Sequence, residues 1–311
     1  MYSRHTIHAL VLSAFVLSLC VTVFSEEHVQ QPLPFPAELV AFQPCKDNPV
    51  FQAGKPGDWD ENIRERGWIL YEDGVYHLWY TGYRSGPDEP RLLGYAYSQD
   101  GMHWERHPDN PVHREGWVED MSVVKVGNRW YMFAEGAGDL THLLTSDDRI
   151  HWEDHGALTI LKTSGEAIEP GPFGTPVIWH EKGVWYLFYE RDAIAVWLAR
   201  SEDLKTWIHV QDEPVMNRGP LAYDLDMIAM DQVIRHGDCY YAYFHGLYPG
   251  GKPREWCSAI AASRDLIHWE KYSGNPLIRD DKSSPIVVQT EEGYRFYTMH
   301  PAVYLFLPAG R

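Results

Sequence analysis

Ser98-Gln-Asp-Gly-Met-His-Trp104 is the first of four copies of one pattern, in which Ser, Asp and Trp keep a fixed spacing. The other copies are Ser146-Asp-Asp-Arg-Ile-His-Trp152, Ser201-Glu-Asp-Leu-Lys-Thr-Trp207 and Ser263-Arg-Asp-Leu-Ile-His-Trp269. Successive copies begin 48, 55 and 62 residues apart along the 311-residue chain. Helical hairpin repeats are shorter than this, whereas the four-stranded blades of a β-propeller with their loops fit the spacing.

Alternating aromatic runs precede the copies and indicate strands. They cover residues 76–83, 130–135, 185–190 and 240–245, and a fifth run at residues 294–300 has no copy behind it. Each run follows a turn rich in Gly or Asp. Ahead of the turns stand further apolar or β-branched segments, at residues 68–71, 121–126, 175–179, 228–235 and 285–289. Five hairpins of this kind predict an all-β protein, a five-bladed β-propeller.

A short tail that contains Pro indicates how the ring closes. Three copies of the repeat are followed by Asp109-Asn-Pro-Val112, Asp212-Glu-Pro-Val215 and Gly274-Asn-Pro-Leu277. Asp47-Asn-Pro-Val50 stands near the start of the chain with no blade before it, and the last hairpin lacks a tail. We therefore expect residues 39–51 to complete the last blade as its outer strand and to close the ring. The alternative is that Asn-Pro marks only a common turn.

The first 25 residues differ in composition from the rest of the chain. Arg4 and two His residues precede an apolar run at residues 9–24, and Val23 and Ser25 suit positions −3 and −1 of a cleavage site. This pattern predicts a secretory signal peptide at residues 1–25 and a secreted or periplasmic protein. Retention of the run as a membrane anchor is the alternative. Residues 26–311 are then expected to form a single catalytic propeller domain with no other membrane contact.

The overall composition is that of a globular protein, with 44% hydrophobic and 23% charged residues. Asp and Glu number 44 against 27 Lys and Arg, which gives a formal net charge of −17. This balance argues against nucleic acid and anionic membranes as partners, because both require clustered Lys and Arg. Cys239 and Cys257 fall on neighbouring predicted strands but out of register, so we expect no disulfide between them. The oligomeric state has no signature in the sequence.

Charged residues gather at one end of the predicted blades. The first strand of a blade lines the central channel and the second runs antiparallel to it, so the start of one and the end of the other share a face. A single charged residue at a strand end is usually solvated, but carboxylates repeated in several blades are costly to bury without a partner or a function. The candidates for catalysis are Asp120, Glu169, Glu190 and Asp231, and those for substrate binding are Asp60, Glu65, Arg66, Glu135, Arg191, His245 and His300.

Converging carboxylates predict cleavage of a glycosidic bond. One carboxylic acid protonates the leaving oxygen, a second carboxylate activates water or attacks the anomeric carbon, and a third can raise the pKa of the acid. The sequence contains no Gly-x-Ser-x-Gly elbow, no His-Glu-x-x-His helix and no phosphate loop. No cluster of ligand residues calls for a metal. Trp59, Trp68 and Trp117 are candidates to stack on a sugar ring.

A family likeness is carried by Glu119-Asp-Met-Ser-Val-Val-Lys-Val-Gly-Asn-Arg-Trp-Tyr-Met-Phe133, by Trp59-Asp60, and by Thr175-Pro-Val-Ile-Trp179 with Gly183-Val-Trp-Tyr-Leu-Phe-Tyr189. These stretches resemble the five-bladed β-propeller glycosidases related to glycoside hydrolase families 43, 32, 117 and 130. The resemblance implies an exported glycoside hydrolase acting on an oligo- or polysaccharide. It implies that Asp120 is the base, that Asp231 modulates the pKa of the acid, and that Glu169 or Glu190 is the acid. No cofactor is required, although some relatives hold a structural Ca²⁺ in the channel.

Three other functions share this architecture. A glycoside phosphorylase would use arginines at the pocket to hold phosphate, and the same arginines would suit an acidic sugar. A carbohydrate-binding propeller without catalysis needs aromatic and hydrogen-bonding groups but not several carboxylates at the axis. A purely structural propeller would have no affinity for sugars. Removal of the Asp120 carboxylate distinguishes the enzyme from the binding protein.

Overall fold

The computed structural model describes Met1 and residues 33–63, 66–86, 89–250 and 254–310. The predicted signal peptide, apart from Met1, and the candidate Glu65 lie outside the described residues. The part of the chain described below belongs to the unit Leu33–Arg311. Across the described ranges, no helix has both the length and the apolar character needed to cross a membrane.

Five antiparallel sheets form the propeller, and they follow one another along the chain. Blade one comprises β2 (Trp68–Glu72), β3 (Val75–Gly82), β4 (Leu92–Ser98) and β5 (Glu105–Arg106). Blade two comprises β6 (Glu119–Val126), β7 (Arg129–Gly136), β8 (Leu140–Ser146) and β9 (Glu153–Ala157). Blade three comprises β11 (Gly174–Glu181), β12 (Val184–Arg191), β13 (Ala195–Ser201) and β14 (Trp207–His209), with the short β10 (Ile160–Leu161) and β15 (Met216–Asn217) beside them.

Blade four comprises β16 (Met227–His236), β17 (Cys239–Leu247), β18 (Trp256–Ser263) and β19 (Glu270–Lys271). Blade five comprises β20 (Ser283–Thr290), β21 (Gly293–His300) and β22 (Tyr304–Pro308) together with β1 (Phe42–Pro44). One helix, α1 (Ala37–Val40), and one 3₁₀ turn, η1 (Ala222–Asp224), complete the described elements. The prediction of an all-β, five-bladed propeller is therefore confirmed.

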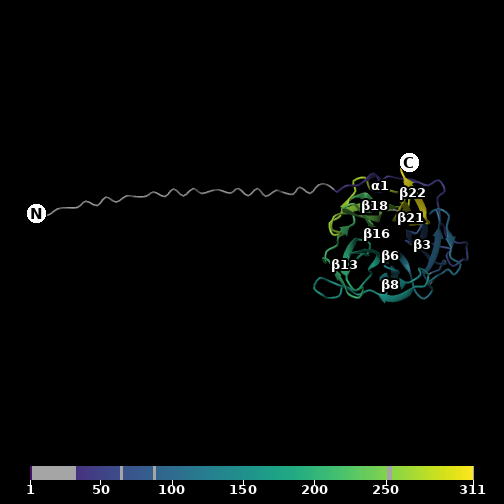
Figure 1. Cartoon of the computed structure of the whole chain (residues 1–311), viewed down its shortest axis with the longest axis horizontal. Helices are drawn as coiled ribbons and strands as arrows, with labels where there is room; N and C mark the ends of the chain where they lie inside the picture. Colours follow the sequence, from purple (N-terminus) through teal and green to yellow (C-terminus); the bar gives the residue numbers. More distant parts are fainter. Residues whose placement is uncertain (2–32, 64–65, 87–88, 251–253, 311) are drawn as a thin grey trace. The chain divides into compact units, whose positions relative to one another are not determined.

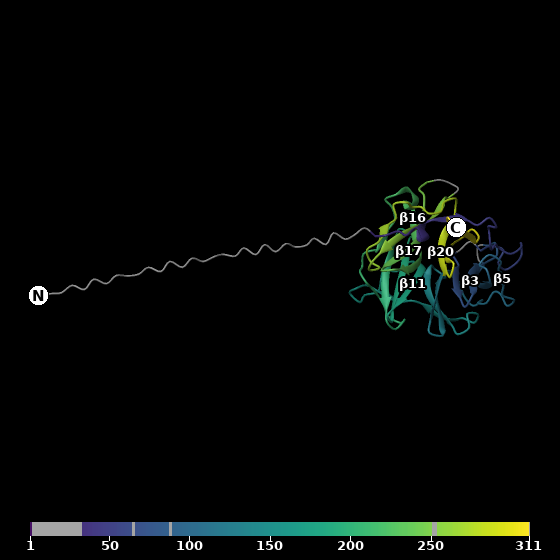
Figure 2. The same cartoon turned by 45° about the horizontal axis from the view of Figure 1, so that its top comes forward.

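The first strands of the blades meet at the centre of the ring. β2 contacts β6, β6 contacts β11, β11 contacts β16, β16 contacts β20, and β20 contacts β2 again. Figure 1 shows β6 and β16 near this centre and β8 and β13 farther out. Figure 2 gives a turned view in which the first strands β11, β16 and β20 are labelled. The start of each first strand and the end of each second strand therefore face the same central space.

The Ser-x-Asp-x-x-x-Trp repeat is the turn that leaves the third strand of a blade. In blade one, Ser98 Oγ accepts a hydrogen bond from the N–H of Gly101 at 2.9 Å. Asp100 Oδ1 accepts bonds from the N–H groups of Met102 and His103, both at 2.8 Å. The same bonds recur in the turns at residues 146–152, 201–207 and 263–269. The repeat is therefore a side-chain cap for turn N–H groups that the strands leave unpaired.

The Asn of the Asn-Pro tail replaces part of a fourth strand. Asn110 accepts a hydrogen bond from the N–H of Tyr95 and donates one to its carbonyl, both at 2.9 Å. Asn275 pairs in the same way with Ile260, and Asn48 with Leu305. Each of these partners lies on the third strand of its blade. In blade five the tail comes from the start of the chain, where β1 pairs antiparallel with β22.

The cysteines are free and buried in the described part of the chain. Cys257 lies opposite Gly246 in the register of β17 and β18, several positions away from Cys239. This register confirms the expectation that the two do not form a disulfide.

The hydrogen bonds of the repeat predict a loss of stability for Asp148→Ala. The carboxylate of Asp148 accepts bonds from the N–H groups of Ile150 and His151 and from the His151 ring. We expect the free energy of unfolding in urea to fall by about 1–2 kcal/mol. Asp147→Ala is the matched control, because the neighbouring Asp147 is exposed and makes only a 3.9 Å ion pair with Arg129. Equal unfolding free energies for the two variants would contradict this role.

Candidate functional site

Three blades carry a β-bulge near the start of the first strand. The register of β6 on β7 shifts between Glu119 and Ser122, and that of β11 on β12 shifts between Gly174 and Val177. In blade four the shift lies between Met230 and Gln232. A bulge leaves a residue outside the strand ladder and redirects its groups. The three bulges therefore present backbone carbonyls and side chains to the axis of the ring.

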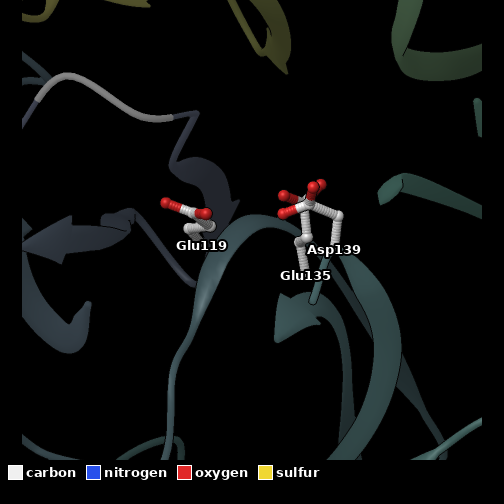
Figure 3. Close-up of side chains that lie close together, drawn as sticks. All are labelled: Glu119, Glu135 and Asp139. Carbon is white, nitrogen blue, oxygen red and sulfur yellow. The ribbon is translucent and has the colours of Figure 1, made fainter. Parts of the chain in front are cut away.

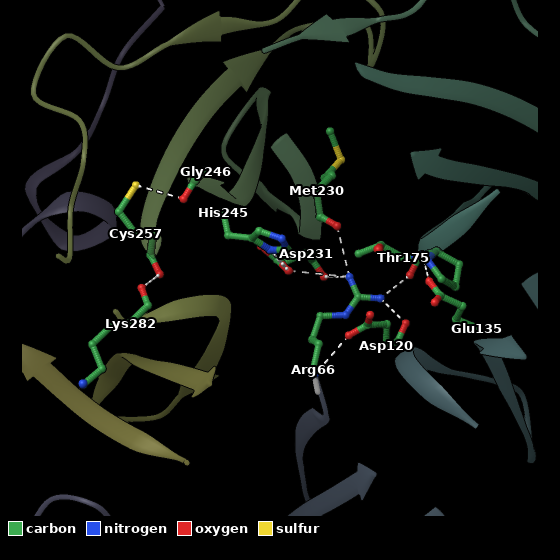
Figure 4. Close-up of polar contacts among 12 residues, drawn as sticks. Arg66, Asp120, Glu135, Thr175, Met230, Asp231, His245, Gly246, Cys257 and Lys282 are labelled. Atoms are coloured by element: carbon green, nitrogen blue, oxygen red, sulfur yellow. Dashed lines mark hydrogen bonds and ion pairs between the residues drawn. The ribbon is translucent and has the colours of Figure 1, made fainter. Parts of the chain in front are cut away.

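The guanidinium group of Arg66 binds all three bulges. Arg66 precedes β2 and is 1% exposed. Its Nη1 donates to the carbonyl of Met230 at 3.0 Å and to that of Asp231 at 3.3 Å. Its Nη2 donates to the carbonyl of Pro176 at 2.7 Å and to that of Asp120. Figure 4 shows this side chain between Asp120 and Asp231. All four of these hydrogen bonds run to backbone carbonyls.

Asp120 is the carboxylate at the first bulge. Its φ is 47°, a left-handed conformation that residues other than Gly adopt at a cost of about 1–3 kcal/mol. The backbone N–H of Arg66 donates to Asp120 Oδ1 at 2.8 Å. Within the described ranges no further hydrogen bond engages this carboxylate. Such strained residues concentrate at functional sites because the surrounding structure holds them for a purpose.

A cavity of about 560 Å³ opens beside Asp120. This volume lies within the range of small-ligand sites. It is lined by Arg66, Asp120, Thr175, His245, Arg254, Trp256, Asp281, Ser283, Ser284 and His300. Thr175 and Ser284 are also left-handed, with φ of 46° and 56°, so strained residues of blades two, three and five share one cavity. Its polar wall suits a ligand rich in hydroxyl groups.

Asp231 and His245 form a hydrogen-bonded pair in blade four. His245 Nδ1 lies 2.9 Å from Asp231 Oδ1, and the Arg66 guanidinium lies 3.8 Å from the same oxygen. Burial raises the pKa of Asp231, and the charges of His245 and Arg66 oppose this rise only in part. Burial also lowers the pKa of His245, but the adjacent Asp231 carboxylate outweighs it, so the pKa of His245 lies above 6.5. The pair therefore favours an imidazolium at the cavity wall.

Glu135 and Glu190 lie at the ends of the second strands of blades two and three. Burial, together with the negative charge of Asp120, raises the pKa of both carboxyl groups. Glu135 Oε2 accepts the N–H of Thr175 at 2.9 Å, and Glu190 accepts the N–H of Ala193. Neither side chain lines the cavity. Glu135 nevertheless contacts the cavity wall, because its partner Thr175 lines the cavity.

Glu119, Glu135 and Asp139 form an acidic cluster in blade two, with oxygens within 4.8 Å of one another. Figure 3 shows the three side chains turned toward the same space. Ca²⁺ takes six to eight oxygen ligands. The Arg91 guanidinium lies 3.2 Å from the Glu119 carboxylate, and the backbone N–H of Thr175 donates a hydrogen bond to Glu135. This cluster therefore does not fit a calcium site, and the structural Ca²⁺ expected in the central channel stays a prediction.

The remaining predicted residues lie elsewhere. Glu169 is exposed and forms a 2.8 Å ion pair with Lys162, which lowers its pKa. Arg191 donates to the carbonyls of Glu169, Pro170 and Pro172, so it holds that loop. Asp60 is buried in blade one between Arg106 at 2.8 Å and Tyr80 at 3.1 Å. None of these three side chains lines the cavity.

The structure thus gathers part of the predicted set and adds to it. Asp120, His245, His300 and Arg66 line the cavity. Asp231 is buried and joins it only through its contact with His245, and Glu135 only through its contact with Thr175. Sequence reasoning missed six lining residues, namely Thr175, Arg254, Trp256, Asp281, Ser283 and Ser284. Thr175 lies at the start of the first strand of blade three, and Ser283 and Ser284 begin that of blade five, two residues before the expected start at residue 285. A search there for hydroxyl groups as well as charges would have found them.

Comparison with known proteins places this geometry in a family. The profile described as "Glycosyl hydrolases family 32 N-terminal domain" matches residues 66–237, more than half of the chain. The chain therefore belongs to this family of glycoside-active proteins.

Individual relatives are more distant. The 1,2-beta-oligomannan phosphorylase of Thermoanaerobacter sp. (strain X514) is 24% identical over 67% of this chain and 72% of that protein. The beta-1,2-mannobiose phosphorylase of the same organism is 29% identical, over 35% of this chain and 43% of that protein. A solved glycosyl hydrolase from Bacteroides ovatus has a TM-score of 0.68 at 15% identity, covering 89% of this chain and 96% of that chain. This structural likeness shows the fold.

The pKa of His245 predicts a pH-dependent part of the stability. The pKa is higher in the folded protein than the ordinary 6.5, so the folded state binds more protons above pH 6.5. The stabilisation is complete below pH 6.5 and is lost as the pH rises through the folded pKa. We expect urea unfolding between pH 6 and 9 to show this loss in the wild type and not in His245→Gln.

His155→Gln is the control, because His155 is exposed and lies in blade two, far along the chain from Asp231. It should keep the wild-type slope of stability against pH. A slope in His245→Gln equal to that of the wild type would show that the imidazole does not hold a proton in the folded state.

Proposed function

We propose that this protein is a glycoside hydrolase that cleaves an oligosaccharide, with Asp120 as a catalytic carboxyl group. The observation that carries this proposal is the position of Asp120, strained and held at the wall of a polar cavity at the propeller axis. The family match and the conformation of Asp120 both favour an enzyme over a binding protein. A binding protein needs aromatic and hydrogen-bonding groups, but it has no need of a carboxylate at the axis of the ring.

Hydrolysis requires two carboxyl groups that reach the substrate. Within the described residues, Asp120 and Asp281 are the carboxylates that line the cavity, and they come from blades two and five. In the proposed reaction one protonates the leaving oxygen as the glycosidic C–O bond breaks. The other takes a proton from the water that attacks the anomeric carbon. Asp281 is preferred to Glu169 as the second carboxyl group, because Glu169 is exposed and paired with Lys162 and does not line the cavity.

Phosphorolysis is the second candidate, and the cationic wall of the cavity favours it. His245, Arg254 and His300 line the cavity, and the raised pKa of His245 favours its charged form. Phosphate would itself attack the anomeric carbon, so that only a proton donor is needed from the protein. Two relatives are named as phosphorylases of 1,2-beta-mannosides. Such disaccharides are therefore the first substrates to test, with and without phosphate.

We expect Asp120→Asn to lower kcat at least 100-fold, because general acid–base groups contribute roughly 10²–10⁴ to rate. Binding of the oligosaccharide should stay within a few-fold of the wild type, since the amide keeps the shape of the carboxyl group. The measurement is product release from beta-1,2-mannobiose and a panel of aryl glycosides, combined with calorimetric binding. Phosphate-dependent release would identify the phosphorylase.

Asp147→Asn serves as the control for Asp120→Asn, because Asp147 is an exposed residue of a repeat turn. It should retain wild-type kcat. Full activity in Asp120→Asn would remove Asp120 from the mechanism. Sugar binding without turnover in the wild type would favour the binding protein.

We also propose that the chain is exported. The support is the apolar run at residues 9–24 together with Val23 and Ser25, which suit positions −3 and −1 of a cleavage site. Expression of the full chain in a bacterial host, followed by fractionation and N-terminal sequencing, should give a periplasmic or secreted protein that begins at Glu26. An intact N-terminus in the membrane fraction would indicate the anchor instead.

A further inference from the structure

Arg66 is a buried cation whose terminal nitrogens bind protein carbonyls, whereas its Nε is buried with no hydrogen-bond partner among the described residues. Its two terminal nitrogens donate to four backbone carbonyls from blades two, three and four. Burial lowers its pKa, although a guanidinium stays charged at physiological pH. A buried charge is costly unless it is paired and its donors are satisfied. Such a group is retained where its geometry has a specific use.

The carbonyls that Arg66 binds belong to the bulges. Asp120, Pro176 and Asp231 lie inside the register shifts of β6, β11 and β16, and Met230 borders the shift of β16. Carbonyls released from a ladder need another donor, because leaving one buried and unpaired costs about 1–3 kcal/mol. A planar guanidinium can satisfy several of them from one point on the axis. The three bulges therefore share one cation.

We infer that Arg66 is a positioning residue for the Asp120 carboxyl group, an inference that rests on the proposed catalytic role of Asp120. Arg66 holds Asp120 at two points. Its side chain binds the Asp120 carbonyl, and its backbone N–H donates to Asp120 Oδ1 at 2.8 Å. The first contact fixes the left-handed backbone, and the second selects one rotamer of the carboxyl group. The other carboxyl oxygen is then the one presented to the cavity.

Lysine cannot replace Arg66 in this role. Its single ammonium nitrogen has three donors at one point, whereas the two Nη atoms of Arg66 reach carbonyls on different sides. One of the three bulges would lose its donor in Arg66→Lys, even though the charge beside Asp231 remains. The positioning role therefore depends on the shape of the guanidinium and not only on its charge.

The test is steady-state kinetics on Arg66→Lys and Arg66→Ala with the best substrate from the glycoside panel. Misplacement of a catalytic group by about 1 Å costs on the order of 100-fold in rate. We expect kcat to fall by about 100-fold in both variants, with KM little changed. Added methylguanidine should restore activity to Arg66→Ala, because it can occupy the vacated site. Methylamine should not restore activity.

Arg235→Ala is the matched control. Arg235 is an exposed arginine whose side chain pairs with Glu181 at 2.6 Å, on the strand end opposite the cavity. It should keep wild-type kcat, and methylguanidine should not affect it. Wild-type kcat in folded Arg66→Lys, or rescue of Arg66→Ala by methylamine, would overturn the inference. If neither variant folds even with methylguanidine present, Arg66 is a folding determinant and the positioning role is rejected.

A crystal structure of Arg66→Lys provides a readout that needs no substrate. We expect Asp120 to leave the left-handed region, because the Arg66 side chain no longer binds its carbonyl, although the backbone N–H of residue 66 is retained. An unchanged Asp120 would overturn the inference, whatever the activity. A wild type inactive on every glycoside, or an active Asp120→Asn, would instead reject the proposed function and leave the structural comparison valid.

Discussion

The cavity depends on one buried guanidinium group. Arg66 stands where the first strands of the blades meet, and it supplies hydrogen-bond donors to carbonyls that three bulges release from their ladders. Without such a donor, each bulge would leave a polar group buried and unsatisfied, at a cost of about 1–3 kcal/mol. Bulges in turn are what direct Asp120 and Thr175 toward the axis. The left-handed conformations of the site residues therefore depend on the guanidinium group that binds the bulges.

The carboxyl groups around this cation differ in environment. Asp120 lines the cavity, whereas Glu135 and Glu190 do not, and burial and the charge of Asp120 raise their pKa values. Asp231 is buried against His245 and Arg66. Neighbouring carboxyl groups cannot all ionise cheaply in a buried site, so burial and the nearby negative charge favour the protonated forms of Glu135 and Glu190.

Hydrolysis and phosphorolysis would use different side chains of the same cavity. Asp120 and Asp281 would flank a sugar and an attacking water, whereas His245, Arg254 and His300 would hold an anion. The propeller fold by itself does not decide between hydrolysis and phosphorolysis. The choice between hydrolysis and phosphorolysis depends on whether water or phosphate occupies the space beside the anomeric carbon.

The sequence by itself determined the blades and their ends. The Ser-x-Asp-x-x-x-Trp turns and the Asn-Pro tails form hydrogen bonds within their own blade, so their residues recur at readable spacings. It also placed Asp120 and His245 at strand ends that meet at the axis. It could not show that Glu169 pairs with Lys162 at the surface. Only the tertiary structure decided the role of Arg66, because its partners Asp120, Pro176 and Met230 lie 54, 110 and 164 residues away in other blades.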